Sequence, residues 1–313
     1  MTLALVVVVA VLPLLVAVTL LELDRYRFEP VPGLVMCLGW GAITAGLWTV
    51  FVRPLFLERA ARLAGGSWPP LTAMLAVAVL LSVVLAVPLV LLGLTSRLLG
   101  PAEWLTHALA IGAGLSLGVS LPAALGPSPG SLPAQLGLAA TPVLGAALIG
   151  LGLGLLVAAR GWVLRSYGLV LLAVTPVTQL AVFRAGLGAG RAGFDAREWL
   201  LVGSSGLLLA SAMVGAWWLE SRILEAELAE EAAHGVLPAR LAAGASALRT
   251  RIRSDWWARR DERRAVNLLL ATLAFRKHAL RGVGPERARI YSLEVGRLRE
   301  RVRRVLGGAE PAP

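Results

Sequence analysis

Titratable side chains are scarce in the most apolar part of this 313-residue sequence. The apolar run over residues 71–96 contains no Asp, Glu, His, Lys or Arg, and the next run holds only Glu103 and His107, both at its mouth. These two residues are one helical turn apart, so their side chains can pair along a helix surface. They are the best candidates in the spans for proton transfer or polar-substrate binding. A lone histidine at a span mouth is more commonly a hydrogen-bonded interface residue, and zinc sites use three or more protein ligands, so we predict neither a metal nor another cofactor.

Two short serine motifs do not add a nucleophile. Residues 114–118 read GLSLG, but a nucleophile elbow needs a strand–turn–helix context, and inside an apolar helix this spacing is typical of a packing face. Residues 203–206 read GSSG, as in rhomboid-type serine proteases, yet no later apolar run contains a histidine. Cys37 is the only cysteine, which excludes an intrachain disulfide and a Cys-based metal site.

The elements that carry these residues are predicted to be membrane helices. The sequence is 57% hydrophobic and only 16% charged, with a mean hydropathy of +0.75, which is typical of a polytopic membrane protein. Lipid leaves no partner for unpaired backbone groups, so the spans must be helical. We predict seven spans, at residues 3–21, 33–52, 71–94, 105–125, 136–159, 163–183 and 199–219. The fold class is thus an all-α bundle over residues 1–219, followed by a helical tail over residues 220–313.

Charge predicts the orientation of the chain. The short loops carry similar numbers of arginines on both sides, whereas the tail from position 220 holds 19 basic against 12 acidic residues. By the positive-inside rule, we expect a multi-pass protein of the bacterial inner membrane with a cytosolic C-terminus and an external N-terminus. The first apolar run lacks a basic leading region and a small-residue cleavage site, so it is predicted to be a retained span.

The tail is predicted to form three or four helices. Residues 255–281 place Trp256 and several leucines on one side and arginines on the other. This helix either packs within a small bundle or lies on anionic lipid, where each arginine contributes about 1 kcal/mol. We expect no nucleic-acid binding, because acidic residues alternate with the arginines and no recognition motif is present.

Two segments at opposite ends of the chain carry a family resemblance. The loop after the first span reads LELDRYRFEPVP, and the tail contains ATLAFRKHALRGVG. Both resemble conserved segments of the PrsW family of intramembrane proteases, together with Trp40-Gly41-Ala42 in the second span. The residues of the loop that match the family motif are Asp24, Arg25, Tyr26, Glu29 and Pro30.

The match fails where the family carries out its chemistry. Alignment on Pro88 places Leu91 and Leu92 at the family's pair of glutamates and Thr95 at its lysine. The family's later histidines fall near residues 141–144 and 175–179, where this chain has none. Leucine neither holds a metal nor moves a proton, so the resemblance implies a member without the catalytic residues. We therefore expect Leu91 and Leu92 to pack against apolar neighbours.

The sequence thus favours a non-catalytic, PrsW-like membrane protein that binds or regulates a membrane-protein partner. One alternative is an active PrsW-type protease, which the resemblance would direct at a membrane-anchored substrate such as an anti-sigma factor. The other alternative is a small-solute carrier or channel, although the spans show no charged pathway.

Overall fold

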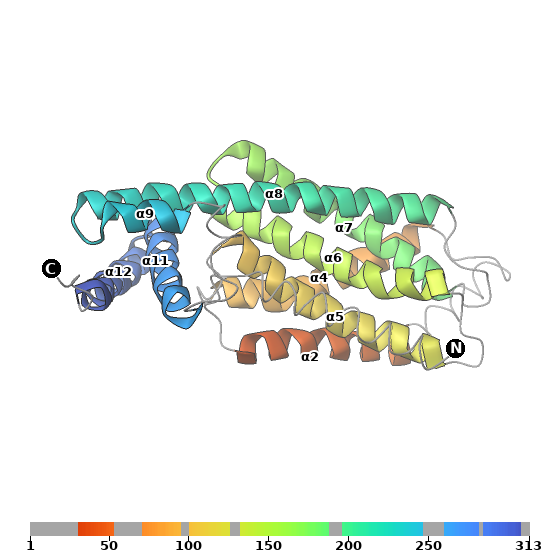
Figure 1. Ribbon diagram of the computed structural model, residues 1–313. Coiled ribbons are helices and arrows are strands. Elements are labelled where there is room, and N and C mark those ends of the chain that lie inside the picture. Colours follow the sequence, from red (N-terminus) through yellow and green to blue (C-terminus); the bar gives the residue numbers. More distant parts are fainter. Residues whose placement is uncertain are drawn as a thin grey trace. The chain divides into compact units, whose positions relative to one another are not determined.

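The chain forms helices that divide into a membrane unit and a tail unit (Figure 1). The computed structural model describes residues 31–52, 71–94, 100–125, 132–187, 196–246, 260–281 and 284–307, and these residues contain helices but no strand. Contacts among Cα atoms separate the two units between Val214 and Gly215. The all-α fold class predicted from the sequence is confirmed.

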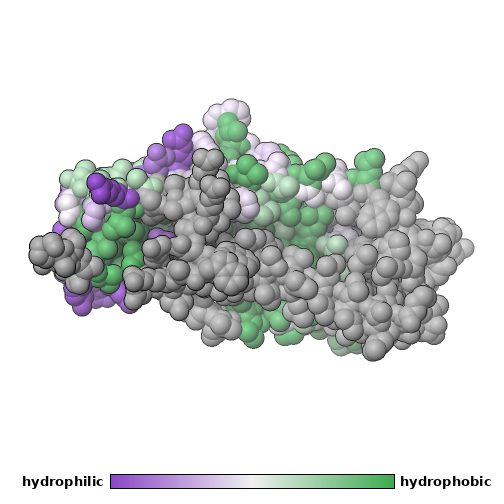
Figure 2. All heavy atoms as spheres, in the orientation of Figure 1, coloured by the Kyte–Doolittle hydropathy of each residue, from purple (hydrophilic) through white to green (hydrophobic). Residues whose placement is uncertain are grey.

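The membrane unit consists of helices whose lengths follow the apolar runs. They are α2 (Val31–Leu47) with the π-helical turn η1 (Trp48–Val52), α4 (Leu71–Leu94), α5 (Pro101–Leu125), α6 (Leu132–Ala158), α7 (Trp162–Leu187) and the first part of α8 (Ala196–Ala233). Hydrophobic side chains lie on the surface of this unit (Figure 2), as expected for helices that face lipid.

Within the described part of the chain, five helices are long and apolar enough to cross a membrane. They lie over Gly33–Phe51, Leu75–Gly93, Ala139–Ala158, Trp162–Leu180 and Gly206–Ala233. Each coincides with a predicted span, and the protein is therefore membrane-embedded. The predicted span at residues 105–125 forms α5, which is not among these five, and the one at residues 3–21 lies outside the described residues. On α8, five glutamates follow Leu219 before the helix ends, so we take the membrane segment to end near Leu219.

Helix α5 lies inside the membrane unit, between α2 and α6 (Figure 1). All of its residues from 103 to 116 are buried. Close approach is possible because a glycine on each helix faces the backbone of the other: a Cβ on Gly114 would lie 2.0 Å from the carbonyl oxygen of Leu38, and a Cβ on Gly41 would lie 2.0 Å from that of Ile111. The predicted glycine packing face is therefore the contact surface of α5 with α2.

The tail unit contains the end of α8 and three further helices, α9 (Ala239–Ser246), α11 (Arg260–Leu280) and α12 (Pro285–Gly307). Helix α8 ends in a turn at Gly235, whose φ of 68° lets the amides of Gly235 and Val236 donate to the carbonyls of Ala232 and Glu231. The glycine thus ends the helix, because few other residues adopt this backbone conformation without strain. Helix α11 buries Leu270, Leu273 and Phe275. Residues 247–259, which include Trp256, lie outside the described residues.

Candidate functional site

The positions aligned with the family's glutamates lie on different sides of α4. Leu92 is buried in an apolar cluster that also contains Leu89 and Trp104. Leu91 is 57% exposed, because neighbouring positions on a helix point about 100° apart. The expectation that both leucines pack in the bundle is correct for Leu92 and wrong for Leu91. Thr95 and the loop residues Asp24, Arg25, Tyr26, Glu29 and Pro30 lie outside the described residues.

Glu103 and His107 lie in the interior of the membrane unit and not at a surface. Both are buried in the first two turns of α5. His107 Nδ1 is 2.8 Å from the carbonyl oxygen of Glu103, and since a carbonyl only accepts, this nitrogen carries the proton. The two residues are buried because α5 is enclosed by its neighbours, and the pairing of their side chains along the helix stays a prediction. Within the described residues, no three His, Cys, Asp or Glu side chains gather as metal ligands.

A second buried polar layer lies deeper in the membrane unit, near the region aligned with the family's histidines. Ser116 Oγ donates to the carbonyl of Ala139 at 2.8 Å, and Thr175 Oγ1 donates to that of Leu171 at 2.9 Å. The Gln179 amide is fully buried and packs over Gly145, where an added Cβ would lie 2.2 Å from Nε2. These polar groups of the described residues are hydroxyls and an amide, which do not act as general acids or bases at neutral pH.

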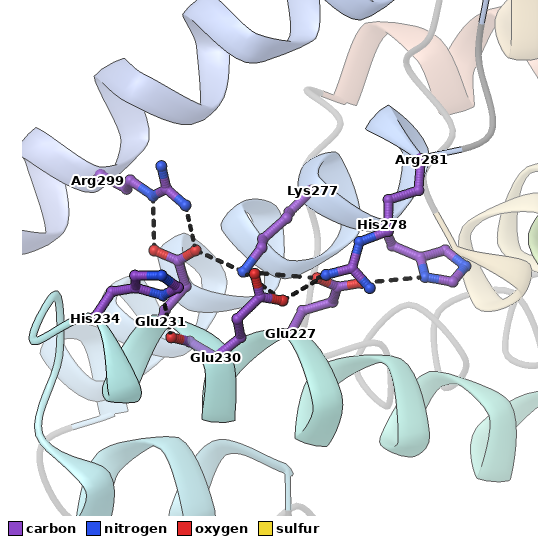
Figure 3. Close-up of polar contacts among 8 residues, drawn as sticks. All are labelled: Glu227, Glu230, Glu231, His234, Lys277, His278, Arg281 and Arg299. Atoms are coloured by element: carbon purple, nitrogen blue, oxygen red, sulfur yellow. Dashed lines mark hydrogen bonds and ion pairs between the residues drawn. The ribbon is translucent and has the colours of Figure 1, made fainter.

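The densest group of charges lies in the tail unit, where three helices meet (Figure 3). We call this group the tail ion cluster. It consists of Glu227, Glu230 and Glu231 from α8, Lys277, His278 and Arg281 from α11, and Arg299 from α12. The acids occupy positions i, i+3 and i+4, which share one face of a helix. Lys277 and Arg281 are also one turn apart.

Glu231 is at the centre of the tail ion cluster and is fully buried. Arg299 donates to both of its carboxylate oxygens, with Nε at 2.7 Å and Nη2 at 2.6 Å, which is the bidentate geometry of strong arginine–carboxylate pairs. Lys277 Nζ lies 2.8 Å from the same carboxylate. This single side chain therefore joins α8 to both α11 and α12.

Glu227 and Glu230 complete the tail ion cluster. Lys277 Nζ is 3.1 Å from Glu230 and 3.8 Å from Glu227, and Arg281 Nη2 is 3.0 Å from Glu227. Three carboxylates thus face three permanent cations, so the cluster is close to neutral. Neutrality and direct pairing are what allow charges to be buried.

The charges of the tail ion cluster reinforce one another. Burial raises the pKa of the Glu231 carboxyl, but the hydrogen bonds from Arg299 and Lys277 outweigh burial and lower that pKa below its ordinary value. The hydrogen bond from Lys277 likewise lowers the pKa of Glu230. The hydrogen bond to Glu231 raises the pKa of Arg299. Pairing therefore favours the ionised forms of Glu230, Glu231 and Arg299.

Sequence reasoning did not find the tail ion cluster. Lys277, His278 and Arg281 lie in the tail segment ATLAFRKHALRGVG, which the sequence marks only by its family resemblance. The available signal was the i, i+3, i+4 spacing of the acids on α8 and the i, i+4 spacing of Lys277 and Arg281 on α11. Comparison of the chain with protein-family models, with curated proteins and with solved structures finds no match to it.

Proposed function

We propose that this chain is a divergent, PrsW-like protein of the bacterial inner membrane, with a cytosolic tail, that acts without catalysis by binding or regulating a membrane-protein partner. One observation carries the proposal. The positions aligned with the family's glutamates hold leucines, one directed outward and one packed in an apolar cluster with Trp104. Neither position can bind a metal or transfer a proton.

The tail ion cluster supports a regulatory role for the tail. Helix α8 begins as a membrane span and ends in the acids that hold α11 and α12. A change in α8 that separates these acids from their cations leaves buried charges unpaired, which costs several kcal/mol. The arrangement of the tail helices is thus tied to the integrity of α8. This coupling is suited to passing a signal between a membrane-bound partner and the cytosol.

A second candidate function is an intramembrane peptidase that uses Glu103 and His107. The observation in its favour is that both side chains are buried one turn apart on α5. Burial is a common setting for acid–base catalysts. Against this candidate, the described residues bring no third ligating side chain to the pair.

Metal content distinguishes the two candidates. The full chain is purified in detergent, incubated with zinc, freed of excess metal and analysed for bound zinc. We expect less than stoichiometric zinc, and the same amount in the double variant Glu103→Gln with His107→Ala. One zinc per chain that is lost in this variant would overturn the non-catalytic proposal and favour the peptidase.

A further inference from the structure

Helix α12 has one face that the tail unit covers and one that it leaves open. The covered face holds Tyr291, Val295 and Val302, each less than 10% exposed. On the opposite face Ile290 and Leu293 are 57% and 62% exposed. Neither residue is needed for packing within the tail unit, so the chain presents two large apolar side chains to whatever surrounds it. Helices with this pattern bind at an interface.

The open face of α12 is also strongly basic. Along the helix, Ile290 and Leu293 are continued by Arg297, Arg301 and Arg304 at spacings of three and four residues, which keeps all five on one stripe. We call these five residues the α12 stripe. Six arginines of α12 are exposed (Arg287, Arg289, Arg297, Arg301, Arg303 and Arg304), against two exposed glutamates (Glu286 and Glu300). Hydrophobic and hydrophilic residues lie next to one another on the visible face of the tail unit (Figure 2).

Two other charged residues of α12, Glu294 and Arg299, are paired with residues of neighbouring helices. Arg299 pairs with Glu231, and Glu294 pairs with Arg276 at 3.2 Å, while Arg276 also lies over the Tyr291 ring. Among the described residues of α12, exposed arginines therefore outnumber exposed glutamates, and three of these arginines lie on the α12 stripe. The two exposed apolar side chains, Ile290 and Leu293, together with the nearby arginines, complement a surface that offers both hydrocarbon and negative charge.

We propose that the α12 stripe docks on an anionic lipid surface, with Ile290 and Leu293 entering the headgroup region and the arginines contacting lipid phosphates. Chain connectivity keeps such a surface within reach, since Glu231 follows Leu219 on the same helix by 12 residues, or about 18 Å. Each arginine near an anionic surface strengthens the attraction to it. The proposal gives α12 the lipid-facing role that the sequence left open for residues 255–281, because the described part of that segment, α11, buries Leu270, Leu273 and Phe275 in the tail unit.

A single-cysteine experiment on the full chain tests this docking. In a Cys37→Ala background, Leu293→Cys carries an environment-sensitive fluorophore, and the protein is placed in nanodiscs of phosphatidylglycerol with phosphatidylcholine or of phosphatidylcholine alone. Ser292→Cys is the matched control, because it is exposed but points about 100° away from Leu293. Quenching by lipids that carry a spin label near the headgroup reports contact with the bilayer.

We expect quenching at position 293 only in the anionic nanodiscs, and little at position 292. The quenching should disappear at about 1 M salt, where the Debye length is about 3 Å, and in the triple variant Arg297→Gln, Arg301→Gln and Arg304→Gln. Equal quenching in both lipids, or none in either, would overturn the proposal. A fluorophore shielded equally in detergent and in both lipids would contradict it, because position 293 would then be covered by the protein itself. The result does not depend on the orientation of the chain or on catalysis, because both leaflets of a nanodisc have the same composition.

Discussion

At the scale of single residues, Glu231 is the side chain on which the tail unit depends most. It is fully buried, and its carboxylate accepts from Arg299 and pairs with Lys277. Glu231→Gln keeps the shape of the side chain but removes its negative charge, so Arg299 and Lys277 lose the charge that they pair with. We expect the free energy of unfolding of the tail unit to fall by about 3–5 kcal/mol. We expect amide hydrogen exchange in α11 and α12 of the full chain to become faster by roughly two to four orders of magnitude.

The control for this variant is Glu225→Gln on the same helix. Glu225 lies 3.5 Å from Arg222 and both side chains are more than 60% exposed, so the loss is expected to be less than about 1 kcal/mol. Similar exchange rates in the two variants would show that the tail ion cluster does not hold the tail helices together.

The pKa values of the same residues predict how the tail responds to acid. The pKa of Glu230 and that of Glu231 are both lowered in the folded protein from an ordinary value of 4.5. A carboxyl with a lowered folded pKa contributes stability that is fully present above its unfolded pKa and is lost as the pH falls through its folded pKa. We therefore expect the protection of α11 and α12 to be constant from neutral pH down to about pH 5 and to decrease below about pH 4.5.

Loss of protection already between about pH 7 and 6 would contradict this assignment, because the carboxylates remain ionised there. Measured in the Glu231→Gln variant, the acid dependence should become weaker, since one of the two titrating groups has been removed.

At the scale of elements, the crossing of α2 and α5 limits what the membrane unit tolerates. A methyl group at Gly114 would meet the backbone of Leu38, which cannot move without shifting α2. Overpacking of this kind costs about 1–3 kcal/mol or more, so Gly114→Ala should lower the unfolding temperature and the folded yield. Gly39→Ala is the matched control, because no described atom lies within 4 Å of its added Cβ.

The control at Gly39 should be neutral or slightly stabilising, since alanine favours helix over glycine by roughly 0.5–1 kcal/mol. The measurement is thermal unfolding in detergent. Equal behaviour of the two variants would contradict the close α2–α5 contact.

The sequence predicted the helices better than the site, for physical reasons. The length of an uninterrupted apolar run is enough to predict a membrane span. For this reason α4 has the same bounds as the predicted span at residues 71–94. The same uniform hydrophobicity hides which side faces lipid, so Leu91 and Leu92 could not be told apart. Glu103 was expected near a surface because a charge at the start of a span commonly lies there, but packing of α5 between α2 and α6 buries it.

The tail ion cluster was out of reach for a different reason. Glu231 and Arg299 are 68 residues apart, and the spacing on each helix indicates a charged face without indicating its partner. The amphipathic pattern of the tail helices was recognised. Which apolar face packs inside and which one stays open depends on how α11 and α12 associate, and no local pattern encodes that association.

At the scale of the whole molecule, the charge distribution predicts topology. The excess of arginines in the tail predicts a cytosolic C-terminus, and an odd number of predicted spans then predicts an external N-terminus. Reporter fusions after Pro313 and before Leu3 measure both positions. A C-terminal reporter that is active only outside the cytosol, or two ends on the same side, would contradict the seven-span arrangement.

The central claim is that this membrane protein works without proteolysis, and a cleavage assay tests it most directly. The purified wild-type chain in lipid is incubated with a single-span model substrate, with zinc or with a chelator, beside a PrsW-type protease that retains its glutamates. The account predicts an intact substrate with this chain under both conditions, while the control protease cleaves it. Metal-dependent cleavage by the wild-type chain, abolished by Glu103→Gln, would contradict the account.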